Sequence, residues 1–473
     1  MFLVIMVSAS SFFSPLSANI YYPIFDVLAR YYNVSNTLTN LTVTTYMILQ
    51  GIAPTLIAGV SDGAGRRPAF IICFIIYLGA NLGLALQTNY AAILVLRMVQ
   101  SAGSSSTIAL ASAVVADIAT SSERGYFTGW ASSGQFIGPG IGPIIGGLLN
   151  HYLGWRSVFW FLLISSGVIF LIMLLFYPET CRKIVGDGTI PPPKWNMSVL
   201  THYHLKKHHA ADKDRPKANK ITILNPLETL AVIFEMEVGL TLFAVAVSFA
   251  SYYAVISSIP SQFTLVYHYN DIQIALCFLP IGLGAMLAVL GGGRAVDLNY
   301  RRYAKNLGFP LVKTKQTDLR HFPIEKARLE IALPVFTIQA LSTIGYGWCI
   351  HYGTNLAGPL IFLFILTTSA ALCFTIMSIL LVDLNPAGAG KVAAANNLVR
   401  CGLGAAATVA IIPMINAMGS GWASTFFGFL CMAFSPILLV IMKWGPEWRE
   451  RRRLKEEENE EKAAAKKERE AAK

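Results

Sequence analysis

Long apolar stretches separated by short polar breaks occupy most of this chain. A helix needs about 20 consecutive apolar residues to cross a bilayer, and twelve stretches reach or approach that length. The six before the polar segment 178–237 are expected at 2–28, 39–60, 69–88, 91–117, 125–149 and 156–177. The six after it are expected at 238–266, 272–293, 331–351, 355–382, 392–417 and 421–443. The pattern predicts an all-α membrane protein with two six-helix bundles.

The composition excludes most soluble classes of protein. Of the 473 residues, 54% are hydrophobic and only 13% are charged, which is too apolar for an ordinary globular domain. The seven cysteines lie singly, without the spacing of a metal site or a disulfide framework. The sequence has no G-x-x-x-x-G-K-[ST] phosphate loop and no G-x-S-x-G or H-E-x-x-H motif. We therefore expect no ATP-driven pump, no enzyme, no metal and no cofactor.

The formal charge of +11 is concentrated in a few polar segments. Of the 37 lysines and arginines, all but Arg30, Arg97, Arg156 and Arg400 fall in segments that the alternation of spans places on one side. Lysine and arginine accumulate on the cytoplasmic side of membrane proteins. Both termini and the segment 178–237 are therefore expected to be cytoplasmic, and the positive charge requires no nucleic-acid partner.

This map divides the chain into four segments. We expect an N-terminal bundle at 1–177, a central cytoplasmic loop at 178–237, a C-terminal bundle at 238–443 and a charged cytoplasmic tail at 444–473. The C-terminal bundle includes a long cytoplasmic loop at 294–330. The central loop carries His202, His204, His208 and His209 without ordered spacing, which favours a solvated basic linker over a metal site.

A short motif occurs twice, once in each bundle. Asp62, Arg66 and Arg67 follow the second span, and Asp297, Arg301 and Arg302 follow the eighth. Both copies read D-x-x-[GY]-R-R. The same signal at the same place in two halves indicates a duplicated, pseudo-symmetric transporter.

The fifth span is unusually rich in glycine and proline. The residues are Gly134, Gly138, Pro139, Gly142, Pro143, Gly146 and Gly147. Membrane helices tolerate them because neighbouring helices satisfy the freed backbone groups. Four of the glycines recur every four residues and form a ridge without side chains, while the prolines add a bend. The ridge predicts close packing against a second helix.

Three stretches resemble conserved motifs of the major facilitator superfamily. The pattern G-x-x-x-G-P-x-x-G-P-x-x-G-G, which starts at Gly134, resembles the antiporter motif on the fifth helix of its drug:proton antiporters. The first copy of the repeat resembles the family's loop between helices two and three, although Ala58 replaces a glycine. Arg97 and Gln100 resemble the R-x-x-Q-G motif of proton-coupled members, although Ser101 follows the glutamine and the glycine comes at Gly103.

Two further stretches resemble the fungal quinidine-resistance branch of these antiporters. One runs from Pro178-Glu-Thr-Cys-Arg182 to Pro191-Pro-Pro193, and the other is the long loop that begins at Asp297. The resemblance implies twelve helices in the major facilitator fold and efflux of drugs, organic cations, polyamines, amino acids or weak acids. It also implies alternating access driven by a proton gradient. We expect a monomer in the plasma membrane, with the vacuolar membrane as the alternative.

The resemblance also implies roles for charged residues. Asp62, Arg66 and Arg67, with their copies Asp297, Arg301 and Arg302, are expected to form gates that hold one state of the transporter. Arg97 is expected to couple proton uptake to substrate release. An arginine inside a span is costly and is a functional hypothesis by default, although Arg97 could instead snorkel to the headgroups. Arg400 is a second such arginine, for which a gate and a structural anchor are both open.

The proton carrier is the least defined element. Asp26 is the sole acid of the first span and lies near its external end, so it is either the coupling acid or a loop charge. Substrate contacts are expected from polar and aromatic residues near the midplane. These are Asn19, Tyr21, Tyr22, Gln50, Gln135, Tyr252, Gln339 and Asn397. Such a lining suits amphipathic or cationic solutes.

Two other functions stay open. No carboxylate lies at the middle of a span, which favours a facilitator or importer that works without protons. A membrane sensor that transports nothing would use the long cytoplasmic loops as its output. The partners expected in every case are the lipid bilayer and, for the transporters, a small-molecule substrate.

Overall fold

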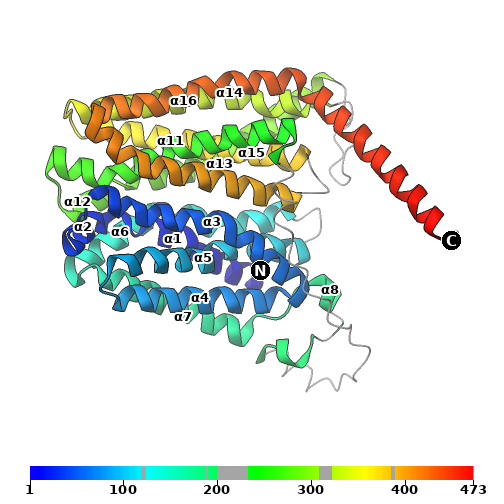
Figure 1. The fold of residues 1–473 in the computed structure, drawn as a ribbon, viewed down its shortest axis with the longest axis horizontal. Coiled ribbons are helices and arrows are strands. Elements are labelled where there is room, and N and C mark those ends of the chain that lie inside the picture. The colour runs from blue at the N-terminus through cyan, green and yellow to red at the C-terminus, as the bar shows by residue number, and fades with distance from the viewer. Residues whose placement is uncertain are drawn as a thin grey trace.

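The fold is an all-helical bundle of two halves (Figure 1). The structure, a computed structural model, describes residues 1–118, 124–186, 190, 192–199, 233–307, 322–384 and 389–471. Most of the predicted central loop, including its histidines, lies outside these residues.

The N-terminal half contains six long helical stretches. They are α1 (Phe2–Asn19), continued by η1 (Tyr22–Ile24) and α2 (Phe25–Tyr32), then α3 (Asn36–Ala64), α4 (Arg66–Leu86), α5 (Tyr90–Ile118), α6 (Arg124–Leu153) and α7 (Arg156–Phe176). Two short elements follow, α8 (Arg182–Val185) and η2 (Lys194–Asn196). The six stretches agree with the predicted spans.

The C-terminal half repeats this arrangement. Its helices are α11 (Met236–Tyr267), α12 (Asp271–Leu276), α13 (Leu279–Asn306), α14 (Ile324–His351), α15 (Ala357–Leu384) and α16 (Ala389–Ala471). Gly419 divides α16 into two spans, because its φ of 83° is non-helical. Ten helical stretches among the described residues are long and apolar enough to span a membrane. The last of these stretches divides into two at Gly419, and α6 is a further long helix, so the total agrees with the predicted twelve.

The two copies of the repeated motif differ in structure. In the first, Gly65 ends α3 with a φ of 115°, a conformation that side chains disfavour. In the second, Tyr300 occupies the equivalent position and α13 stays helical to Asn306. The predicted loop at 294–330 therefore begins with a helical segment, because a tyrosine cannot make the break that the glycine makes.

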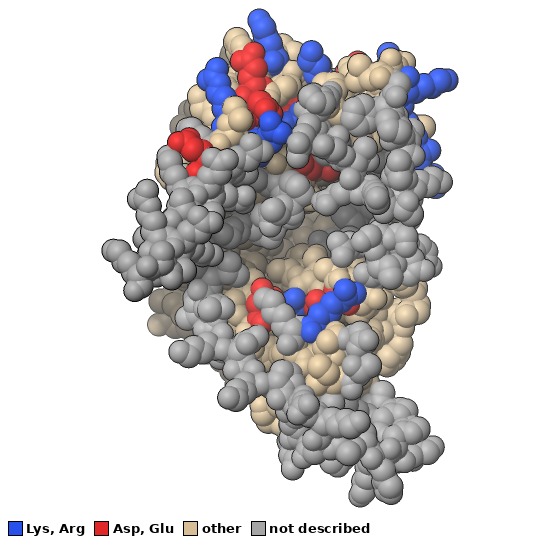
Figure 2. All heavy atoms as spheres, turned by 90° about the vertical axis from the view of Figure 1, so that its right-hand side faces the viewer, with Lys and Arg blue, Asp and Glu red and all other residues tan. Residues whose placement is uncertain are grey.

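The two ends of the bundle differ in the charged side chains that they carry. We call the end with Gly65, Arg182 and the start of α14 the charged end. The opposite end, with Asn33 and His268, carries few charged side chains, and we call it the uncharged end for short. Figure 2 looks onto the charged end, where two groups of charged side chains are separated by a recessed surface. The tail of α16 projects from this end (Figure 1).

Contacts between the halves lie at the uncharged end and in the middle. Near the uncharged end, Asn150 Nδ2 donates to Asp271 Oδ2 over 2.7 Å. Deeper in the bundle, the rings of Tyr22 and Phe278 stack with centroids 5.7 Å apart. Among the described residues, the halves therefore meet at the uncharged end and in the middle, and the recess of Figure 2 lies between them at the charged end.

Candidate functional site

Arg97 lies inside the N-terminal half with its side chain fully buried. Its guanidinium carbon is 4.1 Å from the ring centroid of Tyr21 and 4.4 Å from that of Tyr46. Its Nη1 donates to Gln100 Oε1 over 2.6 Å and to the carbonyl of Ser17 over 3.3 Å. A snorkelling arginine would reach the headgroups, so this geometry contradicts that alternative.

The remaining nitrogens of Arg97 have no partner. Nε and Nη2 are buried and make no hydrogen bond, and no carboxylate of the described residues pairs with the guanidinium. Gln100 is held by Asn81, whose Oδ1 accepts from Gln100 Nε2 over 2.7 Å. This bond turns the amide oxygen of Gln100 toward Arg97. The sequence identified the arginine and the glutamine, but not the asparagine that orients them.

Arg400 forms a second cationic site, partly buried, on the C-terminal half. Its guanidinium carbon lies 4.5 Å from the ring centroid of Phe249 and 4.8 Å from that of Phe374. Its Nη2 donates to Asn397 Oδ1 over 2.7 Å. Asp383 precedes Arg400 in the sequence and was a possible partner for it, but it pairs with Arg328 of α14 over 3.1 Å.

Asn397 connects Arg400 to the other half. Its Nδ2 donates over 2.6 Å to the carbonyl of Gln50, on α3. Next to this bond, a Cβ on Gly51 would lie 3.2 Å from Cys401 Cβ, so α3 and α16 approach closely here. Gln50 contributes its backbone to this contact, and its side-chain Oε1 is buried without a partner.

Asp26 is placed away from Arg97. Its Oδ2 accepts from Thr264 Oγ1 of the C-terminal half over 2.5 Å, near the uncharged end. The structure therefore does not bring together the predicted acid and the predicted arginine. Asp26 instead contributes to the closed end of the bundle.

The other predicted substrate contacts occupy different surroundings. Asn19 donates from Nδ2 to the carbonyl of Pro15, on its own helix. Gln339 makes two bonds to Ser248, which tie α14 to α11 within one half. The ring of Tyr252 packs at a tilt against Phe249 and edge-on against its neighbour Tyr253. The side chain of Gln135 lies outside the described residues.

The predicted glycine ridge packs against α1. A Cβ on Gly138 would lie 2.9 Å from Pro15 Cβ, and one on Gly142 would lie 3.1 Å from the amide nitrogen of Ile20. A Cβ on Gly146 would collide with the carbonyl oxygen of Ile20. This confirms a close helix approach, and the partner helix belongs to the same half. Pro139 and Pro143 lie within α6 beside this contact.

A second glycine face of α6 meets the opposite half. A Cβ on Gly140 would lie 2.9 Å from Gly282 Cα, on α13. Seven residues further, a Cβ on Gly147 would lie 2.5 Å from Ala275 Cβ, on α12. The i, i+7 spacing puts both glycines on one helix face. Sequence reasoning missed Gly140 and Gly282, because the four-residue ridge was the more regular signal.

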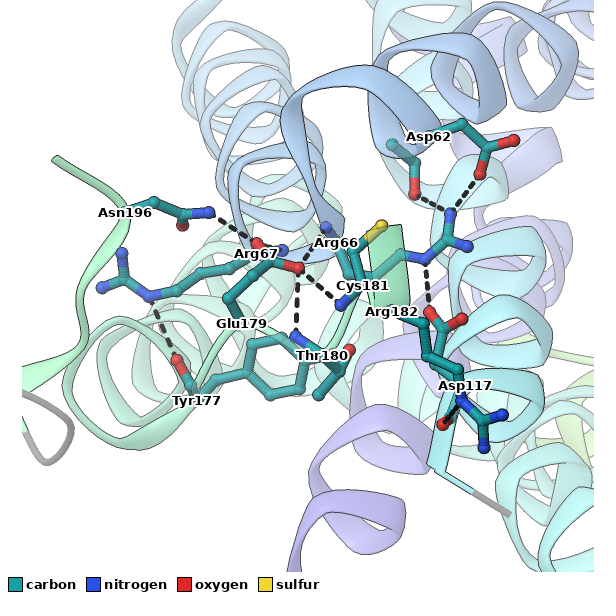
Figure 3. Close-up of polar contacts among 11 residues, drawn as sticks. Asp62, Arg66, Arg67, Asp117, Tyr177, Glu179, Thr180, Cys181, Arg182 and Asn196 are labelled. Atoms are coloured by element: carbon teal, nitrogen blue, oxygen red, sulfur yellow. Dashed lines mark hydrogen bonds and ion pairs between the residues drawn. The ribbon is translucent and has the colours of Figure 1, made fainter. Parts of the chain in front are cut away.

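A polar network at the charged end surrounds the first repeated motif (Figure 3). Arg66 donates from Nη1 to Asp62 Oδ1 and from Nε to Asp117 Oδ2, each over 2.7 Å. Arg67 donates to the carbonyls of Tyr177 and Leu174 over 3.0 and 2.8 Å. These bonds join α3, α4, α5 and α7 within the N-terminal half.

Glu179 organises the same network (Figure 3). Its carboxylate accepts from the backbone nitrogens of Arg66, Arg67, Thr180 and Cys181 and from Asn196 Nδ2, over distances from 2.6 to 3.2 Å. The acid therefore binds the start of α4, where unpaired backbone N–H groups and the helix dipole favour an anion. Asp117 and Glu179 were missed as members of this site, although Glu179 belongs to a stretch that carried the resemblance.

The second repeated motif makes no equivalent site among the described residues. Arg301 and Arg302 are exposed on α13. The side chain of Asp297 lies outside the described residues. The gate predicted for this copy stays a prediction.

Comparisons with known proteins agree with the fold. Residues 7–409 match the family described as Major Facilitator Superfamily. The MFS-type transporter phiD of Fungal sp. (strain ATCC 74256) is 46% identical over 452 residues, which are 94% of this chain and 68% of the relative. Citrate exporter 1 of Aspergillus niger is 35% identical over 464 residues, which are 96% of this chain and 88% of the relative. The crystal structure of a D-xylose-proton symporter aligns with a TM-score of 0.65 at 14% identity, covering 92% of this chain and 96% of the symporter chain.

Proposed function

This chain belongs to the major facilitator superfamily, and from that premise we propose that it exports small organic molecules bearing a carboxylate in exchange for protons. Membership in the drug:proton antiporters, and in their quinidine-resistance branch, is part of the same proposal. The charged end is then cytoplasmic by the positive-inside rule. We place the protein in the plasma membrane as a monomer whose energy source is the proton gradient.

One observation carries the choice of substrate. Arg97 is fully buried, and its Nε and Nη2 have no partner. A buried guanidinium without a counter-ion costs several kcal/mol. A carboxylate accepts two parallel hydrogen bonds from such a group and removes that cost. Carboxylic acids and amino acids therefore fit the site better than organic cations or polyamines, which Arg97 repels.

The surroundings of Arg97 support an exchange of conformations. Tyr46 covers one side of the guanidinium, and it lies on α3, which packs against α16 of the other half. When the halves move, α16 moves relative to α3, so access to Arg97 and Tyr46 from between the halves changes. The buried hydroxyl of Tyr22 makes no hydrogen bond here and is available to donate to a substrate.

The names of relatives are consistent with this proposal. Citrate is a carboxylate, and the exporter of Aspergillus niger named after it is 35% identical to this chain. A facilitator that works without protons is the second candidate function, because Asp26 bonds to Thr264 rather than to a group beside Arg97.

Flux into proteoliposomes separates these functions. The probes are radiolabelled citrate, malate and glutamate, with spermidine as a cation. In an antiporter, an acidic lumen drives uptake of a carboxylate, whereas passive weak-acid diffusion drives it toward the alkaline side. We expect carboxylate accumulation in the acidic lumen and none of spermidine.

Three other results would contradict the proposal. Equilibration that ignores the pH gradient would show a facilitator. Accumulation of spermidine would overturn the assigned substrate class. Flux of no probe would favour the membrane sensor. Liposomes without protein give the baseline in each case.

A further inference from the structure

Two glutamates are buried side by side at the charged end of the C-terminal half. Glu237 lies in the first turn of α11 and is 3% exposed, and Glu325 lies in the first turn of α14 and is 0% exposed. Both contact Gly445 of α16, where an added Cβ would lie 2.9 Å from Glu325 Cγ and 3.6 Å from Glu237 Oε1. Because both side chains lie within 3.6 Å of this one point, the two carboxyl groups are neighbours in the same buried space.

Among the described residues, Arg449 is the cation within ion-pair distance of this pair. Arg449 Nη1 lies 3.4 Å from Glu325 Oε1. Arg452 faces the same region, but its Nη1 pairs with Glu235 over 2.8 Å and its Nη2 donates to a backbone carbonyl over 2.6 Å. The other charged groups that act on the pair from the described parts of α14 and α16 are Lys326, Arg449 and Arg452, and Glu235 beside α11 pairs with Arg452.

The oxygens of the pair lack donors. None of the four carboxyl oxygens of Glu237 and Glu325 accepts a hydrogen bond from a described residue. Two adjacent carboxylates in a buried site cannot both ionise cheaply, and one of them keeps its proton. That proton would also serve as the missing donor between the two groups.

We propose that Glu237 and Glu325 together form a one-proton binding site at the cytoplasmic end of the C-terminal half. Its role as the coupling site of transport rests on the function proposed above. Asp26 does not lie beside Arg97, and we assign the role of proton carrier to this pair instead. It lies in the half opposite to Arg97, so proton and substrate occupy separate places in the bundle.

The packing connects this proton to the arrangement of the helices. Loss of the proton leaves two anions facing Arg449, and their repulsion favours separation of α11 from α14. The other end of α11 carries Thr264, which bonds to Asp26 of the N-terminal half. A change at the first turn of α11 therefore acts on a helix that also closes the uncharged end.

Infrared difference spectroscopy detects such a proton directly. In the full-length protein in lipid at neutral pH, we expect the carbonyl band of a protonated carboxylic acid. Glu237→Gln removes it, because Glu325 alone is ionised beside Arg449, and Glu325→Gln removes it by freeing Arg449 for Glu237. The control is Glu447→Gln, an exposed residue of the same tail, which leaves the band unchanged. The site is refuted if wild-type protein lacks the band or if both variants at the pair retain it.

Transport measurements then separate the site from its coupling role. In Glu237→Gln, carboxylate uptake driven by an acidic lumen should fall at least tenfold. Exchange of carboxylate for carboxylate at equal pH on both sides should persist. If the infrared band is present and wild-type uptake ignores the gradient, the proposed antiport fails and the proton site stands. If gradient-driven uptake survives Glu237→Gln, the pair is not the coupling site.

Discussion

Arg97→Ala is expected to abolish carboxylate uptake while the folded protein still reaches the membrane. The substitution removes the two unpartnered nitrogens that we assign to the substrate. Charge-assisted hydrogen bonds contribute about 3 kcal/mol at most, which corresponds to roughly a hundredfold in affinity. Folding should tolerate the change, because a buried guanidinium without a counter-ion destabilises the folded state, and the substitution removes that cost. Binding of radiolabelled citrate and flux into proteoliposomes are the measurements.

Two further variants make this result specific. Arg97→Lys keeps the charge but loses the planar fork, so we expect a loss of about tenfold, smaller than that of the alanine variant. Lys305→Gln removes one positive charge from an exposed position on α13 and should leave flux unchanged. Wild-type flux in Arg97→Ala would remove the arginine from the mechanism.

Gly140→Leu is expected to produce the second large effect. A side chain there would enter the space held by Gly282 across the interface of the halves, since even a Cβ would lie 2.9 Å from its Cα. Overpacking of this kind costs about 1–3 kcal/mol, which acts against the conformation closed at the uncharged end. We therefore expect flux to fall roughly tenfold or more, measured in proteoliposomes beside a thermal unfolding curve.

Gly79→Leu is the matched control on α4. A Cβ at Gly79 meets nothing within 4 Å, so its flux should match that of wild-type protein. A loss of flux in both variants would point to a general effect of leucine. Unchanged flux in Gly140→Leu would show that the glycine contact is not used during transport.

Hydropathy alone was sufficient to predict the helices. The span expected at 156–177 is α7 (Arg156–Phe176), and the one expected at 238–266 is α11 (Met236–Tyr267). The prediction fails where a helix continues past its apolar part, as α13 does to Asn306. Apolar length reports what the membrane requires, whereas a helix ends where its backbone changes conformation.

Residue environments were harder to predict. Arg97 could be placed inside a span, but its position between the rings of Tyr21 and Tyr46 depends on contacts among three helices. Glu237 and Glu325 fell just outside the predicted spans, where a carboxylate is ordinarily solvated. Their burial arises because α14 begins at Ile324 and the tail of α16 covers both residues, and neither feature has a local sequence signal.

We propose that the two halves rock as rigid bodies about the contact between α6 and α13, so that one end opens as the other closes. Pulsed electron spin resonance on pairs of spin labels tests it directly, in a Cys349→Ala background. One pair, at Tyr152 and Tyr352, reports the uncharged end, and the other, at Ile118 and Lys305, reports the charged end; all four positions are exposed. We predict that citrate and a change of pH lengthen one distance while they shorten the other. Distances that stay constant, or that change in the same direction, would show that the halves do not rock about this contact.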